Sequence, residues 1–264
     1  MQRMQTFTYL KGPDTFELSL PDADKTIVSG VRWGNPCTLF TPAYWYTQYV
    51  MRGPTQTPTR HRLGLTFAEE VAACVLGGYG IPAEVGKAAF EHVKQTGLIQ
   101  SLCDDATVLE HALCEPLRIE NRMVRYRFWK KKASYLASAF RHLRFTQLPL
   151  DDALELRNEL LALPGIGPKT ASWIVRNWTG SNAIAILDIH IVRAGVLMNL
   201  FGLHERVEKD YLQMEMRFVA LANNLTVPTS DLDALIWSMM RTTPYLVAQV
   251  LRSHNRLYAN SGAA

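Results

Sequence analysis

Cysteine is scarce in this sequence and widely spread along it. The four cysteines are Cys37, Cys74, Cys103 and Cys114, and no two of them form a C-x-x-C pair. That spacing argues against a zinc site. No cysteine follows Asp188, which excludes an iron–sulfur cluster in that region. Thiols inside cells are usually reduced, so we expect all four to be small, buried side chains.

Long apolar runs are also absent. Polar or charged residues interrupt every hydrophobic stretch before it reaches the roughly 20 residues that a membrane span needs. Residues 1–10 lack the charged and then apolar layout of a secretory signal. The 264 residues, 48% of them apolar, are enough to bury a full hydrophobic core. We therefore expect a globular, intracellular protein without a membrane partner.

Acidic residues are missing between Glu120 and Asp151. The eight cations of this segment give it a charge of +8 in a chain whose net charge is +4. Such clustering is typical of a phosphate-binding face, although most charge runs form only a solvated helix face. Interleaved aromatic residues indicate an amphipathic helix with its cations outward. The cations are Arg122, Arg125, Arg127, Lys130, Lys131, Lys132, Arg141 and Arg144.

The N-terminal residues differ in pattern from the rest. Runs of β-branched and aromatic residues at 7–10, 16–20 and 26–33 are separated by Gly, Pro and Asp, which predicts short strands. The polar stretch GPTQTPTRHR, residues 53–62, is typical of a linker. We therefore expect residues 1–62 to form a small extension that contains short strands.

From Thr66 onward the apolar spacing is helical. Thr66 with Glu69 matches a capping box, and so does Ser230 with Asp233. We expect a mostly α-helical body, with one subdomain over 63–162 and a second over 163–264. The predicted helices cover residues 82–97, 106–117, 123–143, 150–162, 189–201 and about 209–223, with an earlier one from 66 and a last one from 230.

The strongest motif is LPGIGPKTA, residues 163–171. One helix should end near residue 162 and another begin at Pro168, where the missing N–H leaves no bond unmade. Gly165 and Gly167 let the backbone approach another surface closely. The second helix offers unpaired N–H groups at its start. The motif therefore predicts a helix-hairpin-helix that binds a nucleic-acid phosphate through Gly165, Ile166 and Gly167.

Such hairpins also occur in proteins that only hold DNA, and the residues that follow separate the two classes. Asp188 comes nineteen positions after Lys169, within AILDIHIVR at 185–193. Hairpin, lysine, short apolar strand and aspartate resemble the helix-hairpin-helix, Gly/Pro-rich, Asp superfamily of DNA glycosylases. The similarity spans about residues 66–243 and is closest to the bifunctional 8-oxoguanine DNA glycosylases. It implies two helical subdomains of that fold, here with an N-terminal β-containing extension.

The resemblance implies a catalytic pair. Breaking the bond between base and deoxyribose builds positive charge on the sugar, which the carboxylate of Asp188 would stabilise. A neutral Lys169 would capture C1′ as an imine and so permit elimination of the 3′ phosphate. A helix N-terminus and partial burial would favour the neutral amine. Asp188 is also expected to cap the helix that follows it, and the alternative for Lys169 is an ordinary exposed lysine.

The resemblance also assigns DNA contacts, because a flipped base must be held outside the stack. Trp173, an aromatic residue at helical spacing, could equally belong to the core. His190 and Arg193 could equally have structural roles. No required cofactor or metal is implied, and a monovalent cation at the hairpin is the one option. The phosphate contacts would be His190, Arg193, Arg125, Lys130, Lys131 and Lys132; the base contacts Trp173, Asp233 and Trp237; and the duplex-inserting residue Tyr79.

Two departures from the compact prokaryotic enzymes bear on the substrate. Those enzymes stop just after the Trp-bearing helix, and their chain end contacts the base, whereas this sequence continues over 244–264. It also has the extra residues 1–62. We expect a monomeric glycosylase and AP lyase for an oxidised purine, 8-oxoguanine, in double-stranded DNA, acting on the nucleoid if prokaryotic. A different damaged or modified base, a non-catalytic DNA-binding protein, and an RNA-binding or scaffold role remain alternatives.

Overall fold

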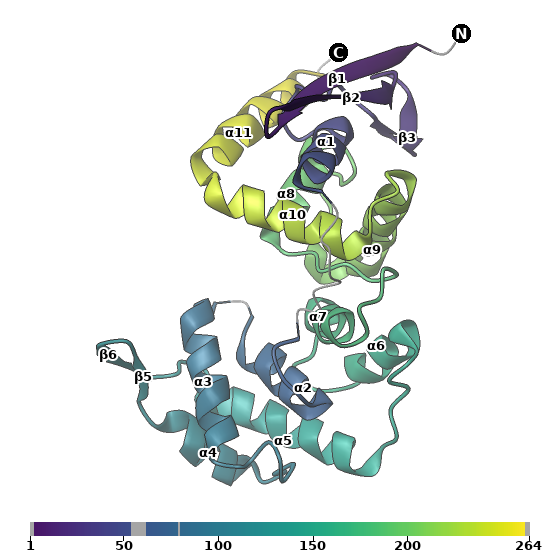
Figure 1. Ribbon diagram of the computed structural model, residues 1–264. Coiled ribbons are helices and arrows are strands. Elements are labelled where there is room, and N and C mark those ends of the chain that lie inside the picture. The colour runs from purple at the N-terminus through teal and green to yellow at the C-terminus, as the bar shows by residue number, and fades with distance from the viewer. Residues whose placement is uncertain (1–2, 54–61, 79, 262–264) are drawn as a thin grey trace. The chain divides into compact units, whose positions relative to one another are not determined.

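The computed structural model describes residues 3–53, 62–78 and 80–261, with side chains to residue 254. Within these ranges the chain is mostly helical with short antiparallel strand pairs, as predicted (Figure 1). No helix there is both long enough and apolar enough to cross a bilayer. The chain divides into a discontinuous unit, residues 1–58 with 182–264, and a continuous unit, residues 59–181.

The discontinuous unit joins the two ends of the sequence. Strands β1 and β2 pair from Met4 opposite Pro21 to Lys11 opposite Asp14, and the tight turn between them places Gly12 at φ +64°. These strands and the next pair fall where the short strands were predicted. The elements are β1 (Met4–Lys11), β2 (Asp14–Pro21), β3 (Thr26–Val28), β4 (Val31–Arg32), α1 (Pro42–Arg52), α8 (Ile189–Leu197), α9 (Val207–Asn224), α10 (Thr229–Thr242) and α11 (Pro244–Ser261).

A single hydrophobic core runs through this unit. Leu20, Trp33 and Trp45 from the N-terminal segment belong to the same buried cluster as Phe218 of α9 and Leu235 of α10. The N-terminal residues therefore do not form the separate 1–62 extension that was expected, and the chain does not divide at residue 163. A core is defined by which apolar side chains pack together and not by their order along the chain.

The continuous unit is helical apart from one strand pair. Thr66 caps its first helix as predicted, since its hydroxyl accepts a hydrogen bond from the N–H of Glu69 at 3.2 Å. The Glu69 carboxylate accepts from the N–H of Leu65 and pairs with Lys94. The elements are α2 (Phe67–Leu76), α3 (Ala83–Gln95), α4 (Ala106–Cys114), β5 (Leu117–Ile119), β6 (Arg122–Val124), α5 (Trp129–Phe145), α6 (Ala153–Leu161) and α7 (Pro168–Thr179).

The helix predicted over 123–143 starts later than expected. Residues 122–124 form β6, which pairs with β5 through a turn in which Glu120 has φ +51°. The β5–β6 hairpin contacts α3, and α5 begins only at Trp129. Tyr126, between hairpin and helix, is buried and donates its O–H to the carbonyl of Leu76 at 2.5 Å. This contact between distant segments fixes the start of α5.

The cysteines are less buried than expected. Only Cys74 is buried, whereas Cys103 is half-buried and Cys37 and Cys114 are exposed. The Cys74 thiol donates to Glu70 at 3.6 Å, and its burial raises the pKa of that thiol well above the usual value. The polar stretch at 53–62 that was predicted as a linker lies mostly outside the described residues.

If the N-terminal segment belongs to the core, removing its buried tryptophan must destabilise the protein. Trp45 is fully buried beside the ring of Phe40. We expect Trp45→Ala to lower the free energy of unfolding by about 3–5 kcal/mol, measured by urea unfolding followed by far-UV circular dichroism. Leu10→Ala, at a side chain on the same segment that is 73% exposed, should change it by less than about 0.5 kcal/mol. Similar small effects of both variants would contradict the shared core.

Candidate functional site

The predicted hairpin is present between α6 and α7. Helix α6 ends at Leu161, α7 starts at Pro168, and Ile166 between them is buried while Gly165 and Gly167 are exposed. Gly165 has φ +80°, and a Cβ there would lie 2.0 Å from the ring of Tyr135 on α5. Glycine is therefore required at this position by both the backbone and the close approach. The hairpin rests on α5 and presents two glycines to solvent.

Lys169 is the second residue of α7 and is half-buried. The N–H groups of the first turn of a helix have no partner within the helix, so the start of α7 favours an anion. Helix α7 is fixed to α2 from within the unit. Asn177 donates to Glu70 at 2.9 Å, and the same buried carboxylate accepts the N–H groups of Leu63 and Gly64. The support for Lys169 is thus a buried polar network.

The basic segment divides into two groups. Arg141 and Arg144, at the end of α5, both pair with Asp104, and the hydrogen bond from Arg141 lowers the pKa of the Asp104 carboxyl. The Arg122 guanidinium lies 3.4 Å from Glu84. The rest behave differently. Among the described residues, no carboxylate pairs with Arg125, Arg127, Lys130 or Lys131.

Lys131 connects the basic helix with the hairpin. Its ammonium lies 5.8 Å from the centroid of the Tyr135 ring, the ring on which Gly165 rests. The Lys130 ammonium lies 4.9 Å from the Trp129 ring, and both lysines are exposed. A ring under an ammonium orients the cation without neutralising it. Among the described residues, positive charge without a carboxylate partner therefore lies next to the hairpin turn.

Lys132 is placed differently from the lysines beside it. Its half-buried ammonium donates to the carbonyls of Val75 at 2.5 Å and Gly77 at 3.5 Å, which caps the C-terminal end of α2. Burial, followed by the charge of Lys131, lowers the pKa of the Lys132 ammonium. Its hydrogen bonds are made within the unit, and the phosphate contacts of Lys130, Lys131 and Lys132 stay predictions.

Trp173 lies one turn after Lys169 on α7 and is half-buried. A Cβ on Gly77, at the end of α2, would lie 3.5 Å from its ring. The tryptophan therefore covers the start of the loop that follows α2. Tyr79, which was predicted to enter the duplex from that loop, lies outside the described residues. Its role and the base contact of Trp173 stay predictions.

Asp188 is the N-cap of α8, as expected. Its Oδ1 accepts hydrogen bonds from the N–H groups of His190 at 2.8 Å and Ile191 at 3.0 Å. Both bonds reach one oxygen, so the second carboxylate oxygen accepts none within the described part of its own unit. Arg193 is exposed, and His190 is half-buried with an Nδ1 that has no partner in the described ranges. Their phosphate contacts remain predictions.

The apolar stretch before Asp188 is not the short strand that was predicted. Ile184, Ala185 and Leu187 are buried, yet residues 184–188 form neither strand nor helix. Their backbone groups bond to side chains instead. The Tyr211 hydroxyl donates to the carbonyl of Ala185 at 3.0 Å and accepts from the N–H of Leu187 at 3.1 Å. Each such group left unpaired in the interior would cost about 1–3 kcal/mol.

Three more side chains complete this anchoring of the stretch. Glu215 of α9 accepts the N–H of Ala185 at 3.2 Å. Asp233 of α10 accepts the N–H of Ile186 at 3.3 Å, and Thr229 donates to the carbonyl of Asn182 at 2.8 Å. Asp233 is 2% exposed. The capping box predicted at Ser230 is therefore wrong, because α10 starts at Thr229 without a side-chain cap and the carboxylate of Asp233 points inward.

Trp237 presents a different environment from Asp233 on the same helix face. Its ring is 41% exposed, and the Arg241 guanidinium lies 4.4 Å from the ring centroid. Residues four apart on a helix share a face, so Asp233, Trp237 and Arg241 form a row from the core to solvent. An exposed tryptophan is a suitable stacking surface, whereas the buried carboxylate is already committed to the backbone. Base contacts of both residues stay predictions.

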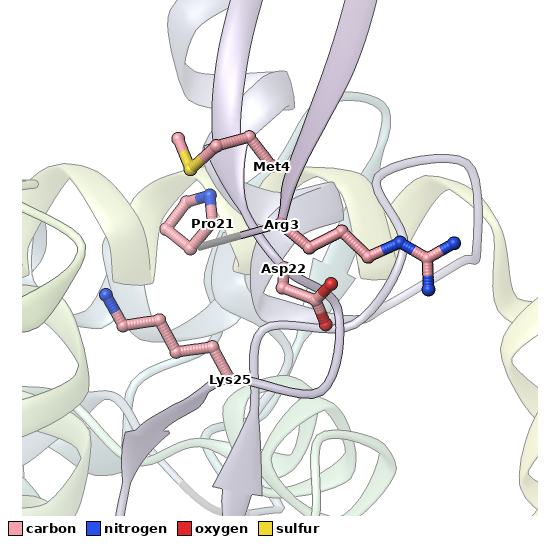
Figure 2. Close-up of a pocket in the computed structure, with 5 residues that line it drawn as sticks. All are labelled: Arg3, Met4, Pro21, Asp22 and Lys25. Carbon is pink, nitrogen blue, oxygen red and sulfur yellow. The ribbon is translucent and has the colours of Figure 1, made fainter. Parts of the chain in front are cut away.

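Two cavities among the described residues lie away from these side chains. One of about 280 Å³ lies at the open end of the β1–β2 ribbon, and Figure 2 shows Arg3 and Lys25 extending away from each other there. The other, of about 140 Å³, lies beside His254 and Arg217. A ligand pocket needs polar groups that converge, and no predicted site residue lines either cavity. We assign them no function.

Tyr211 and Glu215 were not predicted from the sequence. Their spacing places both on the inner stripe of α9 with Met214 and Phe218, which are fully buried. A glutamate on an apolar stripe was the available signal, because a buried carboxylate needs hydrogen-bond donors nearby. Nothing in the spacing indicated that the donor would be the backbone before Asp188.

Comparisons with known proteins agree with this geometry. A helix-hairpin-helix family described as 8-oxoguanine DNA glycosylase matches residues 65–227. A relative from Saccharolobus islandicus, named 8-oxoguanine DNA glycosylase/AP lyase, is 31% identical over an alignment of 133 residues, and the match covers 47% of this chain and 63% of the relative. A relative of the same name from Picrophilus torridus is 34% identical, and the match covers 46% of this chain and 59% of the relative's length. The chain thus spans less than two thirds of the length of each of these relatives.

Solved structures of similar fold include the 8-oxoguanine DNA glycosylases of Thermotoga maritima and Methanocaldococcus jannaschii. Each has a TM-score of 0.51 and is 24% identical in sequence. The first covers 66% of this chain and the second 67%, and in both the match spans 78% of the solved chain. At this identity the likeness establishes the fold.

The two hairpin glycines should respond in opposite ways to a methyl group. Gly165→Ala places a Cβ inside the Tyr135 ring at a positive φ, so we expect the free energy of unfolding to fall by more than about 1 kcal/mol. Gly167 has φ −87°, and a Cβ added there would have no atom within 4 Å. Gly167→Ala should leave stability unchanged or raise it by up to about 1 kcal/mol. Equal losses in thermal or urea unfolding would contradict this geometry.

Proposed function

Since this chain belongs to the 8-oxoguanine DNA glycosylase family, we propose that it excises an oxidised purine, 8-oxoguanine, from double-stranded DNA and then cleaves the strand at the abasic site. The observation that carries the proposal is the position of Lys169. The hairpin leads directly into α7, and this amine stands on its first turn. A phosphate bound at the turn would bring a neighbouring sugar within reach of the amine.

Lys169 would act as the nucleophile. As its Nζ bonds to C1′, the glycosidic bond breaks and its electron pair leaves with the base, which takes up a proton. Opening of the sugar ring gives a protonated imine, the Schiff base. The imine makes the C2′ proton acidic, and removal of that proton expels the 3′ phosphate. One amine thus supports both base release and strand cleavage.

Asp188 would supply negative charge to the sugar. Cleavage of the glycosidic bond passes through a state with positive charge on the sugar, and a fixed carboxylate stabilises it. The two N–H groups that bind its Oδ1 orient the carboxylate and leave the other oxygen for this task. Its anchored backbone means that little reorganisation is needed during the reaction.

The remaining predicted residues would bind DNA. The hairpin, Lys130 and Lys131 would contact phosphates, with further contacts from Arg125, His190 and Arg193, and Trp237 would stack on the flipped base. The chemistry requires no cofactor, and a monovalent cation at the hairpin would strengthen its hold on a phosphate. We expect the protein to act as a monomer inside the cell, on the nucleoid if its source is prokaryotic.

One observation favours a different lesion as the second candidate. The residues after Thr242 form α11, in the region where the compact enzymes have ended. A chain end cannot then contact the base in the same way. Base release from a panel of duplexes carrying different oxidised, alkylated and deaminated bases would decide between 8-oxoguanine and another substrate.

Borohydride trapping tests the nucleophile. With an 8-oxoguanine duplex, the wild type should give a reduced covalent adduct, because borohydride converts the imine into a stable amine. Lys169→Gln should give none, although it should bind the duplex with a Kd within about threefold of the wild type, since only the amine is lost. The readout is a gel shift that survives denaturation.

Lys87→Gln is the matched control for trapping, since this lysine on α3 is not among the predicted site residues. It should trap like the wild type. An adduct formed with an abasic duplex but not with an 8-oxoguanine duplex would support the lyase activity and reject 8-oxoguanine as the substrate. Full trapping by Lys169→Gln would reject the assigned nucleophile.

Salt dependence tests the division of the basic segment. Each phosphate contact that is lost should make the slope of log K against log salt less negative by about 0.9. We expect that change for Lys131→Gln, whose ammonium has no carboxylate partner among the described residues. Arg141→Gln should leave the slope unchanged because its guanidinium is already paired with Asp104 and makes no phosphate contact. Equal slopes for the two variants, measured by fluorescence anisotropy, would contradict the assignment.

A further inference from the structure

The stretch that leads into Asp188 depends on α9 for its shape. Within its own unit it forms neither strand nor helix, and the phenol of Tyr211 bonds it at two points, the carbonyl of Ala185 and the N–H of Leu187. Leu187 is the residue directly before Asp188. The phenol therefore fixes the backbone on one side of the aspartate, while the first turn of α8 fixes the other.

We propose that Tyr211 is a positioning residue for Asp188, with Glu215 as its support. Tyr211 is only 2% exposed, which keeps it from contacting DNA directly, and its hydrogen bonds to Ala185 and Leu187 connect it to the backbone before Asp188. Glu215 adds an acceptor for the N–H of Ala185, one turn along α9. The inference rests on the proposed function, because it concerns how the carboxylate of that reaction is aimed.

The geometry distinguishes positioning from simple packing. Phenylalanine has nearly the shape of tyrosine, so Tyr211→Phe keeps the ring in the core and removes only the oxygen. The carbonyl of Ala185 and the N–H of Leu187, both in buried residues, then lose their common partner. Buried backbone groups must be bonded, so the stretch has to shift to find new partners. A displacement of about 1 Å at a reacting group can reduce a rate about a hundredfold.

A double-mutant cycle tests the proposal. We expect Tyr211→Phe to lower the single-turnover rate of base release by about 10- to 100-fold while the Kd for DNA stays within about twofold. In an Asp188→Asn background, where the aimed carboxylate is gone, the same change should alter the residual rate of base release by less than about twofold. Tyr44→Phe, a half-buried tyrosine of the same unit, is the control and should leave all rates unchanged.

Equal losses from Tyr211→Phe in both backgrounds would overturn the proposal, because the phenol would then act independently of Asp188. If Tyr211→Phe does not fold, as judged by circular dichroism, Glu215→Met, which removes the acceptor of the Ala185 N–H, gives the same test, and its loss should also disappear without Asp188. An inactive wild type that still binds DNA would reject the proposed function itself, and this inference with it. An active wild type with additive losses would reject the inference alone.

Discussion

Backbone that crosses a protein interior outside a helix or sheet must still find partners for its N–H and C=O groups, and residues 182–188 are such a stretch. The discontinuous unit supplies those partners from side chains of α9 and α10, above all from Tyr211 and Glu215. The arrangement needs a closed core around it, which the N-terminal segment helps to provide, since α1 packs on α10 and shares its hydrophobic cluster. The N-terminal strands are thus structurally tied to the position of Asp188, although they lie far from it in sequence.

In the continuous unit, one buried carboxylate likewise accepts hydrogen bonds from backbone that lies outside the helices and strands. Glu70 accepts hydrogen bonds from the backbone at Leu63 and Gly64 and from Asn177 on α7, so it joins the entry of the unit to the helix that carries Lys169. The cations are sorted by their partners in a comparable way. Those that stabilise the unit have carbonyl or carboxylate partners inside it, and those beside the hairpin keep their charge for solvent. The same basic segment therefore contains cations that are bonded within the unit and cations that are exposed beside the hairpin, and only the exposed ones are proposed to contact phosphates.

Local features were predictable from sequence, and features made by distant contacts were not. The hairpin at 163–169, the cap at Thr66 and the cap at Asp188 depend on a few adjacent residues, and each was found where predicted. The β5–β6 hairpin replaced part of a predicted helix, and the stretch before Asp188 replaced a predicted strand. Strand β6 is paired by the neighbouring strand β5, and the backbone before Asp188 is bonded by side chains of α9 and α10, so neither segment takes its structure from its own residues alone. The joining of residues 1–58 with 182–264 is a contact of the same long-range kind.

The most direct test of the central claim is to identify the amino acid that carries the sugar. The adduct formed on an 8-oxoguanine duplex can be reduced, digested with nuclease and protease, and sequenced by tandem mass spectrometry. The account predicts a deoxyribose remnant on Lys169, in the peptide that begins the helix after the hairpin. A remnant on Lys130, Lys131, another lysine or the N-terminal amine would contradict it, because the hairpin would then bind DNA without presenting the nucleophile.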